Sequence, residues 1–482
     1  MSAPQHDLDI ALAAPPSQRA PDTPDDMDPR SPGAAPPESP QSVTIAGGGL
    51  LGMVLALRLA QTGHAVTLLE GAPRGGGLAG AQSIGGLDWD RFYHVVLLSD
   101  GRTRALLDEL GLADRLQWGT TRTGFYTDGA MHSMSDTLEF LRFPPLSLLD
   151  KLRLGGTIFA ASRIRDHRRL ERVSAIDWLR RWSGPRVLEK IWMPLLRSKL
   201  GDNAPLASAA FIWAIIARMY AARRAGLKRE LFGWIDGGYA IVIDALQRRL
   251  DAAGVRTLHD ARIVSIAGDA SGAVATLADG RRIEAERLVS TLPVPVFASV
   301  CAGLRAEGRA RAEAVVTQGI VCVSLLIEQP LSPYYVTNVT DRWVPFTGVI
   351  EMTALVPPAR FGGRSLVYLP IYLPQDAPEW AQDDAAILEP CIAALERMHP
   401  HFRREQVIDA KVARARHVLA VSTIDYTERA MPGLVTGVPN VFQLNSAQIA
   451  QGTLNVDETI GVVEQRLAEL RRAMQAGSKA RR

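Results

Sequence analysis

The sequence predicts an α/β fold with a parallel β-sheet, and three observations near the start of the chain support this prediction. An apolar run from Val43 to Ile45 leads into glycines with the spacing G-x-G-x-x-G, and an apolar helix pattern follows them. A second apolar run, residues 65–69, ends at an acid, Glu70. A strand, a glycine turn, a helix and a second strand in this order form the unit that binds dinucleotides.

Each glycine of this loop has its own physical task. Gly47 permits the tight turn from strand to helix, Gly49 lets a pyrophosphate approach the backbone, and Gly52 allows the helix to pack closely on the strand. Leu50 and Leu51 open the helix, whose free N–H groups and positive dipole end attract phosphate. The loop therefore predicts a phosphate-binding turn.

Glu70 and a second glycine loop extend the predicted site. The acid at the end of the second strand is expected to accept hydrogen bonds from ribose hydroxyls, and its charge disfavours a 2′-phosphate. Gly76, Gly77 and Leu78 follow, so the backbone can approach the ligand a second time. Simple doubly wound NAD enzymes do not need this second loop.

The two loops together resemble the FAD-dependent amine oxidase superfamily, which includes protoporphyrinogen oxidase, phytoene desaturases and, more distantly, UDP-galactopyranose mutase. The resemblance covers about residues 42–470, with its clearest further motifs at residues 290–293 and 451–456. It implies FAD as the cofactor. It also implies a Rossmann-like FAD-binding domain, with a parallel sheet and a three-stranded β crossover, interleaved in sequence with an α+β substrate domain.

The resemblance also implies how the chain is divided. The expected parts are a proline-rich disordered tail (1–41), three segments of the FAD-binding domain (42–100, 233–300 and 416–474), a helical part (101–232) and a β-sheet part (301–415) of the substrate domain, and a basic tail (475–482).

Further cofactor-binding residues follow from the same resemblance. Val264 is expected beside the adenine, and Thr291 and Pro293 lie at the end of a strand that closes over the cofactor. A strand, a glycine-bearing loop and a helix near the carboxyl terminus are expected to face the flavin pyrimidine, through Asn445, Ser446, Gly452, Thr453, Leu454 and Asn455. Relatives usually have an acid where Asn445 and Ser446 stand, but neutral groups also form hydrogen bonds.

Candidate catalytic residues each have an alternative interpretation. Asp90 and His94 resemble an acid and a histidine that run beside the flavin ring in relatives, although His94 fits equally a core histidine bonded to a carbonyl. Glu351 follows an apolar strand and is either a proton acceptor or a strand-end charge. Arg197 and Lys199 either hold an anionic substrate group or are ordinary solvated helix charges.

Composition places the chain among globular proteins with more than one structural unit. It has 482 residues, of which 47% are hydrophobic and 22% charged, and this length exceeds one ordinary core. The net charge of +3, without a basic stripe carrying interleaved aromatic residues, predicts no binding of nucleic acid. The three cysteines are widely separated, so we expect neither a metal site nor a redox dithiol.

We expect a cytoplasmic protein, because the sequence predicts neither a signal peptide nor an apolar run of the roughly 18 residues that a spanning helix needs. Two basic clusters, within residues 163–172 and 223–229, flank an apolar helix at residues 209–216. They indicate either a peripheral contact with an anionic membrane surface or the solvated ends of a buried helix.

The predicted chemistry is removal of a hydride from a carbon of an apolar or lipid-like substrate, with flavin N5 as the acceptor in a water-poor cavity. Two alternatives remain. One is a non-redox flavoenzyme similar to UDP-galactopyranose mutase, which needs arginines placed for a diphosphate. The other is a membrane-surface binding protein with a vestigial cofactor site.

Overall fold

The computed structural model describes residues 39–135, 137–164, 166–223, 231–450 and 453–479. The tail expected to be disordered lies outside these residues except for its last three, and so do Gly452 and residues 224–229 of the second basic cluster. Residues 40–482 form one unit, and the elements below all belong to it.

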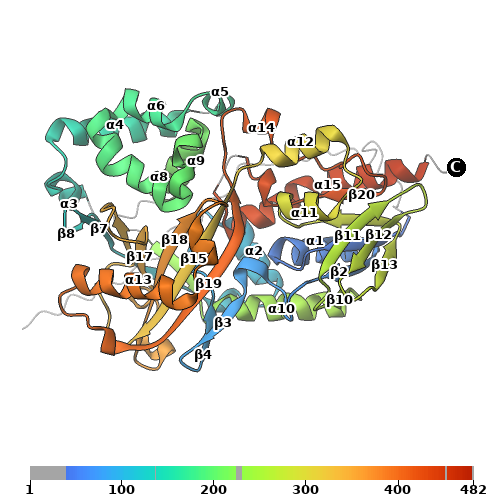
Figure 1. Cartoon of the computed structure of the whole chain (residues 1–482), viewed down its shortest axis with the longest axis horizontal. Helices are drawn as coiled ribbons and strands as arrows, with labels where there is room; N and C mark the ends of the chain where they lie inside the picture. Colours follow the sequence, from blue (N-terminus) through green and yellow to red (C-terminus); the bar gives the residue numbers. More distant parts are fainter. Residues whose placement is uncertain (1–38, 136, 165, 224–230, 451–452, 480–482) are drawn as a thin grey trace, which may run out of the picture. The chain divides into compact units, whose positions relative to one another are not determined.

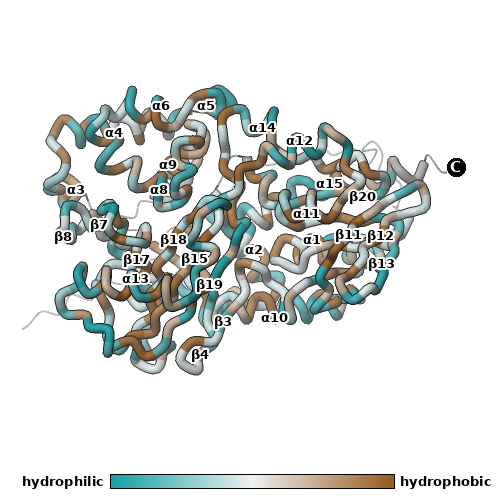
Figure 2. Tube along the Cα trace, in the orientation of Figure 1, coloured by the Kyte–Doolittle hydropathy of each residue, from teal (hydrophilic) through white to brown (hydrophobic). Residues whose placement is uncertain are grey.

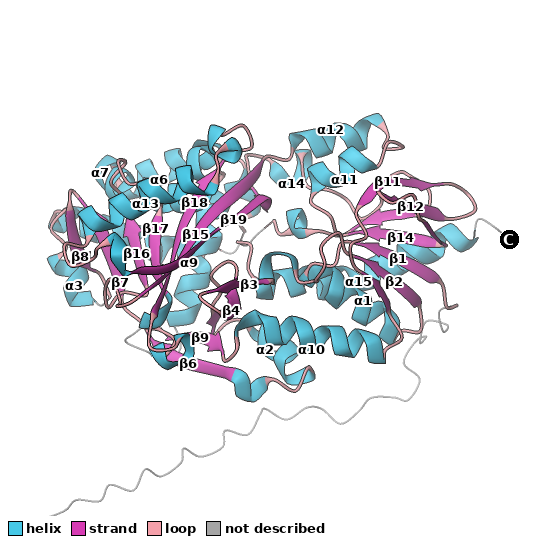
Figure 3. Ribbon diagram, turned by 60° about the horizontal axis from the view of Figure 1, so that its bottom comes forward, coloured by secondary structure: helices cyan, strands magenta, loops and turns pink. Residues whose placement is uncertain are grey.

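The predicted parallel sheet is present (Figure 3). Its strands come from three separate stretches of the chain. The order is β10-β2-β1-β14-β20, and all four pairings are parallel. The strands are β1 (Ser42–Ala46), β2 (Ala65–Leu69), β10 (Arg256–Leu258), β14 (Arg287–Ser290) and β20 (Val441–Gln443). Strand β20 is the edge strand of this sheet, and its residues are buried.

Helices α1 (Leu50–Gln61), α10 (Gly238–Ala252) and α15 (Val456–Lys479) pack together beside this sheet (Figure 1). Helix α1 is apolar on nearly every side because it contacts both α10 and α15. Helix α2 (Gly101–Glu109) packs on α15. We expected α15 to end near Met474, but it continues to Lys479, so the predicted basic tail begins inside this helix.

The three-stranded β crossover is confirmed between β10 and β14. Its strands are β11 (Ile263–Gly268), β12 (Ala273–Leu277) and β13 (Arg282–Ala285), all antiparallel. A hairpin turn at residues 278–280 joins the last two. Side chains of this unit and of α11 (Val294–Val300) form one apolar cluster on the parallel sheet.

A seven-stranded sheet forms the second layer of strands, in the order β19-β15-β18-β17-β16-β7-β8. Its strands are β7 (Thr123–Thr127), β8 (Ala130–Ser133), β15 (Thr317–Ile327), β16 (Val336–Val339), β17 (Gly348–Glu351), β18 (Ser365–Leu373) and β19 (Val407–Ala420). Hydrophobic residues concentrate along β15 and β18 (Figure 2), and every residue of β15 is buried. Separate apolar clusters contain alternate residues of this strand, so both sheet faces are covered.

Residues 101–232, expected to be helical, also contain strands. Besides β7 and β8, this stretch contributes β6 (Leu116–Thr120), which pairs with β9 (Leu231–Ile235) and, through it, with β5 (Val96–Leu97). The prediction missed β7 because it pairs in parallel with β16, more than two hundred residues later. A two-stranded pair, β3 (Ala81–Ile84) and β4 (Leu87–Asp90), precedes this stretch.

The remaining helices pack in a separate apolar cluster or cover the sheets. Ser147 and Ser174 cap two of them, and Pro185 opens a third. These helices are α3 (Thr137–Arg142), α4 (Leu148–Arg163), α5 (Arg168–Glu171), α6 (Ala175–Ser183), α7 (Pro185–Val187), α8 (Met193–Leu200), α9 (Ala209–Arg223), α12 (Ala306–Ala314), α13 (Asp384–Met398) and α14 (Tyr426–Arg429). Within the described part of the chain, no helix has the length and apolar character needed to cross a bilayer.

Candidate functional site

The first glycine turn is held by its neighbour in the parallel sheet. Gly47 has a φ of +113°, and its N–H donates to the carbonyl of Leu69 at 2.9 Å. The Thr291 hydroxyl, at the end of β14, donates to the carbonyls of Ala46 and Gly47 at 3.1 and 2.9 Å. A Cβ at Gly47 would lie 2.6 Å from that hydroxyl oxygen. Thr291, predicted as a cofactor residue, therefore fixes the shape of the loop.

The other two glycines differ in what surrounds them. A Cβ at Gly52 would lie 1.9 Å from the Gly47 carbonyl oxygen, so only glycine fits where α1 crosses the turn. Gly49 has a φ of −66°, and a Cβ there would have only the Gly77 Cα within 4 Å, at 3.8 Å. The space beside Gly49 is thus open, as a bound pyrophosphate requires.

The start of α1 fits an anion. In the structure as described, no side chain caps this helix and its first turn holds no acid. Leu50 and Leu51 are buried in the core below, so their side chains do not compete for the N–H groups of the first turn. Uncapped N–H groups at a helix start are the donors that phosphates use.

Glu70 turns back toward the loop. Its carboxylate accepts from Gly48 N–H at 2.9 Å and from Ala72 N–H at 2.8 Å. Its main chain exchanges 2.8 Å hydrogen bonds with Leu258 and Ala261, on the stretch that leads into β11. The acid is only partly buried, and a carboxylate has capacity for more than two hydrogen bonds. Its position fits a ribose between the glycine loop and β11.

Val264 lies on that adjoining strand, in a β-bulge. Ile263 and Ser265 pair with Leu277 and Thr276, and Val264 between them falls outside the ladder register. Its side chain is 46% exposed, which is uncommon for valine in a strand. A flat aromatic ring such as adenine would cover this side chain and meet the main-chain groups that the bulge leaves unpaired.

The second glycine loop contacts the first. Gly76 N–H donates to the Gly48 carbonyl at 2.8 Å, and Gly49 and Gly76 form a parallel bridge. A Cβ at Gly77 would lie 3.1 Å from the Gly49 Cα. Leu78 packs at the edge of an apolar cluster of the larger sheet. The structure therefore brings the two predicted loops together.

Arg91 was missed by the sequence analysis. Its Nη2 donates to the Gly77 carbonyl at 2.7 Å, while its Nε is buried without a hydrogen-bond partner among the described residues. A cation with an unused donor beside both glycine loops suits a diphosphate. The available signal was its place next to Asp90, in a segment that the sequence had already singled out.

The carboxyl-terminal residues meet the end of β14. Pro293, Asn445 and Ser446 line a cavity of about 10 Å³, enough for about one water. Asn445 is buried, and its Nδ2 has no hydrogen-bond partner in the described part of the chain. Relatives usually have an acid at this position, and the unused N–H group of the Asn445 amide can also form a hydrogen bond with a ligand.

Thr453, Leu454 and Asn455 lead into α15. The Asn455 side chain accepts from Glu458 N–H at 2.9 Å and donates to the Thr453 carbonyl at 2.7 Å, which caps the helix. Asp457 accepts from Thr103 N–H at 2.8 Å and so ties this end to α2. The first turns of α1 and α15 contribute side chains to the same apolar cluster. Gly452 lies outside the described residues.

Asp90, which is buried, and His94, which is partly buried, lie side by side. Asp90 is 3% exposed and accepts from Tyr239 N–H at 2.7 Å, at the start of α10. Burial raises the pKa of Asp90 to about 7. The His94 Nδ1 lies 3.8 Å from the Asp90 carboxylate, too far for a hydrogen bond, and burial lowers the pKa of His94 to about 4. His94 is therefore neutral at neutral pH.

Glu351 lies at the end of β17, in the seven-stranded sheet, and is fully buried. Its carboxylate accepts from Leu331 N–H at 2.9 Å and from the hydroxyls of Thr353 and Ser365. Burial raises the pKa of this carboxyl. These contacts tie a loop to the sheet, as a structural carboxyl does, and a catalytic role for Glu351 stays a prediction.

Arg197 and Lys199, considered together from the sequence, point to different places. Arg197 lines a cavity of about 360 Å³ with Arg180, Lys190 and Arg342. The Lys199 ammonium instead lies 3.4 Å from the Tyr93 hydroxyl, which is 3.0 Å from the hydroxyl of Tyr372. Residues two apart on a helix face different directions.

Known proteins resemble this chain over most of its length. The family profile described as flavin containing amine oxidoreductase matches residues 52–445. Coproporphyrinogen III oxidase of Mycobacterium tuberculosis is 26% identical over 321 residues, which cover 60% of this chain and 67% of that protein. The 15-cis-phytoene desaturase of Solanum lycopersicum is 25% identical over 289 residues, covering 54% and 48%.

Solved structures show the same fold. An oxidoreductase from Methanosarcina mazei aligns with a TM-score of 0.67 at 18% identity and covers 88% of this chain and 99% of its own. Reduced UDP-galactopyranose mutase aligns with a TM-score of 0.67 at 17% identity, covering 90% and 94%. The predicted fold class is confirmed.

Replacing Gly49 with leucine should remove most of the flavin from the purified protein, because the side chain would fill the open space at the start of α1. The backbone at Gly49 suits any residue, so the fold should survive. Gly156→Leu, an exposed position in α4 with no heavy atom within 4 Å of an added Cβ, is the matched control. Flavin absorbance per protein is the measurement, and equal flavin in both variants would contradict the assignment.

Exchanging Glu70 for alanine should weaken flavin binding by about 1–3 kcal/mol, the usual cost of losing hydrogen bonds to a charged group. Glu284→Ala, on the exposed face of β13, is the control. Isothermal titration of flavin-depleted protein gives both affinities. If Glu70→Ala binds the flavin as tightly as the control, Glu70 does not contact the cofactor.

His94 and Asp90 should contribute to the free energy of unfolding with opposite dependences on pH. Because the pKa of His94 falls from 6.5 to about 4 on folding, its contribution is lost as pH falls through that window. The pKa of Asp90 rises from 3.8 to about 7, so its contribution is lost as pH rises. Relative to the parent, His94→Gln should lose stability, and Asp90→Asn gain it, as pH rises from about 4 to 6.5.

Urea denaturation across that pH range measures both slopes. Changes of the same sign in the two variants would show that at least one of these groups does not titrate as its burial implies.

Proposed function

Because the chain belongs to the flavin containing amine oxidoreductase family and is a flavin-dependent oxidoreductase of small molecules, we propose that it binds FAD and oxidises a carbon of an apolar or lipid-like substrate. The observation that carries this proposal is the meeting of both glycine loops beside the uncapped start of α1. Every cofactor-binding role given below belongs to this proposal.

FAD is proposed over a mononucleotide because several features would serve only the adenosine half. Glu70 stands at the ribose position, and the bulge at Val264 offers an apolar surface and free main-chain groups for adenine. Arg91 and the start of α1 would hold the diphosphate between the two halves. A flavin mononucleotide would leave Glu70 and Val264 without a ligand.

The tyrosines around Tyr93 support an apolar substrate, because their side chains are neutral and largely shielded from water. Side chains of Tyr93, of Tyr335 and of two residues of β18, Tyr368 and Tyr372, share one apolar cluster. Tyr335 and Tyr368 are buried and the other two partly buried, and burial raises the pKa of each phenol. They remain neutral and exclude water. A bound flavin supplies the hydride acceptor, and a dry surrounding favours such a transfer.

Lys199 provides the polar contact in these surroundings. Its ammonium lies over the rings of Tyr93 and Tyr372, at 5.6 and 5.8 Å from their centroids. Among the described residues, no carboxylate lies within ion-pair distance of it. A half-buried ammonium without a counter-charge favours an anionic or carbonyl oxygen brought by the ligand. Lys199 would thus hold the polar end of an otherwise apolar substrate.

His94 is the preferred candidate for a catalytic contact with the substrate, because its buried Nδ1 makes no hydrogen bond with described residues. Burial lowers its pKa to about 4, so the ring is neutral at neutral pH and only weakly basic. Glu351 is less suitable, because its carboxylate already accepts hydrogen bonds from a main-chain N–H and two hydroxyls.

A non-redox mutase is a second candidate, favoured by one observation. Arg197 and Arg342 line the 360 Å³ cavity and form no ion pair or hydrogen bond within the described structure. Arginines placed in this way suit a diphosphate. The resemblance to reduced UDP-galactopyranose mutase supports only the fold.

The flavin spectrum separates these functions. The purified protein should be yellow, and anaerobic addition of compounds that donate a hydride from carbon, such as cyclic polyenes and porphyrinogens, should bleach it. Turnover of a sugar nucleotide only after chemical reduction of the flavin would instead support the mutase. Colourless protein that also fails to bind added FAD would contradict both proposals and favour a vestigial cofactor site.

Lys199→Met should leave the flavin content unchanged and raise the apparent Kd of a bleaching substrate about tenfold or more, since a charge-assisted hydrogen bond contributes about 1.5–3 kcal/mol. Lys199→Arg should restore part of the affinity. Lys190→Met is the control, because Lys190 pairs with Asp128 at 3.0 Å at a different place. Equal Kd values in the two methionine variants would remove Lys199 from the substrate site.

A further inference from the structure

Exposed apolar side chains gather on two neighbouring helices. Of the thirteen large hydrophobic side chains exposed in the described residues, six lie within residues 138–159. Single exposed leucines are ordinary, but a contiguous group marks an interaction surface. We call this group the α3–α4 face. Its members are Leu138, Leu141, Leu148, Leu149, Leu152 and Phe159.

Helix α4 is apolar on two sides, and the fold uses only one of them. Leu154 and Ala161 are buried in the helical cluster. Leu148, Leu152 and Phe159 follow one another at spacings of four and seven residues, which places them in one stripe, and they are 66%, 66% and 53% exposed. The stripe does not belong to the core of residues 40–482.

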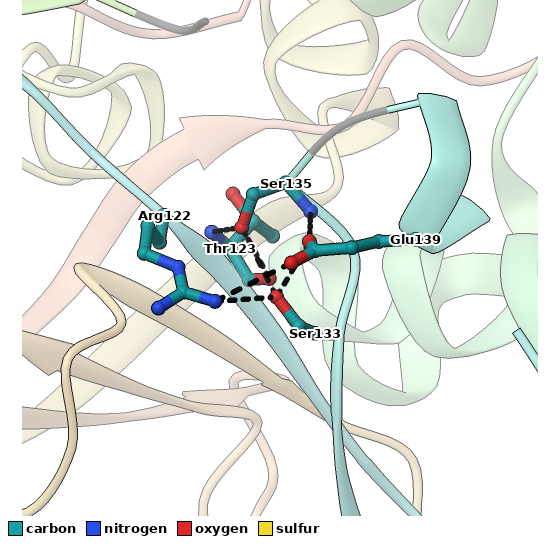
Figure 4. A network of polar contacts seen from close by, with 5 residues as sticks. All are labelled: Arg122, Thr123, Ser133, Ser135 and Glu139. Carbon is teal, nitrogen blue, oxygen red and sulfur yellow. Dashed lines mark hydrogen bonds and ion pairs between the residues drawn. The ribbon is translucent and has the colours of Figure 1, made fainter. Parts of the chain in front are cut away.

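A polar network around Glu139 fixes the orientation of helix α3 (Figure 4). Glu139 accepts from the Ser133 hydroxyl at 2.6 Å and from Ser135 N–H at 2.7 Å, and it pairs with Arg122 at 3.3 Å. The Ser133 hydrogen bond, followed by that from Ser135, lowers the pKa of Glu139 and keeps it charged. With Glu139 bound to these partners beside β8, Leu138 and Leu141 face outward.

The charges around this face are arranged by sign. Arg142, Arg153 and Arg163 are exposed and have no hydrogen bond or ion pair in the described structure, and Arg163 stacks on Phe159 at 4.6 Å. The acids are held inward, Glu139 in its network and Asp150 in the cap of α4 at 8% exposure. The face is therefore apolar with a cationic rim.

We propose that the α3–α4 face docks on a membrane surface that contains anionic lipids. Leucine and phenylalanine with unpaired arginines at their edge are what a helix needs to lie in the headgroup region. A second copy of this chain fits less well, because a twofold contact would bring the arginines of both copies together. The docking goes beyond the oxidoreductase function and does not depend on it.

This surface differs from the one that the basic clusters suggested. Of the first cluster, Arg163 borders the α3–α4 face through its contact with Phe159, while Arg165 and residues 224–229 of the second cluster lie outside the described structure. The apolar helix between the clusters, α9, has its first residues buried in the helical core. The sequence analysis therefore suggested a membrane contact, but of the residues it named only Arg163 is part of the surface proposed here.

Sedimentation with vesicles tests the proposal. The full-length protein should pellet with phosphatidylcholine vesicles that contain phosphatidylglycerol, and about tenfold less with pure phosphatidylcholine. Leu148→Gln/Leu152→Gln should lower binding about tenfold or more. Arg142→Gln/Arg153→Gln should remove most of the salt-sensitive part, because such attraction is screened. Val435→Gln, at an equally exposed residue (63%), should bind like the parent.

Circular dichroism and flavin content establish that each variant is folded. Failure of the folded parent protein to pellet with phosphatidylglycerol vesicles would overturn the proposal. Equal binding by the leucine variant and the Val435 variant would do so as well. A dimer of the parent that the leucine variant dissolves, seen by analytical ultracentrifugation without vesicle binding, would assign the face to a second copy instead.

Discussion

The contact between the Gly47 carbonyl and the Cα of Gly52 is the constraint on which the rest of the structure depends. With no side chain at Gly52, α1 starts directly over the end of β1, and Thr291 of β14 locks the turn from the other side. That lock joins segments about 240 residues apart in sequence. Helices α10 and α15 then pack on α1, so one steric requirement aligns all three segments of the parallel sheet.

The sequence could predict this region because its signals are local. Glycine spacing, an apolar helix and an acid after a strand all lie within residues 42–70, and the observed elements agree with them almost residue for residue. The crossover strands were predictable for the same reason, since each hairpin pairs neighbours. The edge position of β20 was not, because strand order depends on which distant segments meet.

The sequence predicted the parts of the site that are formed by the backbone, such as the glycine loops. It did not predict the parts formed by side chains that come together from distant elements. Arg91 acquires its place only when the second glycine loop folds onto the first. Lys199 is distinguished from Arg197 only by the arrival of Tyr93 and Tyr372 from other segments. Helical spacing alone, however, already argued that residues two apart would not share one ligand.

The buried carboxyl of Asp90 lies where the parallel sheet and its helices meet the seven-stranded sheet, and its contacts join the two. Its side chain accepts from the start of α10, while its main-chain carbonyl accepts from the Tyr368 hydroxyl of β18 at 2.5 Å. Asp90, the last residue of β4, thus joins α10, which packs beside the parallel sheet, to β18 of the seven-stranded sheet. Tyr93 and His94 follow it closely in sequence, so this anchor also determines their position. A buried carboxyl is costly, and the positive end of α10 offsets part of that cost. Burial of His94 itself lowers the pKa of that imidazole, so a neutral ring lies beside Asp90 at this junction.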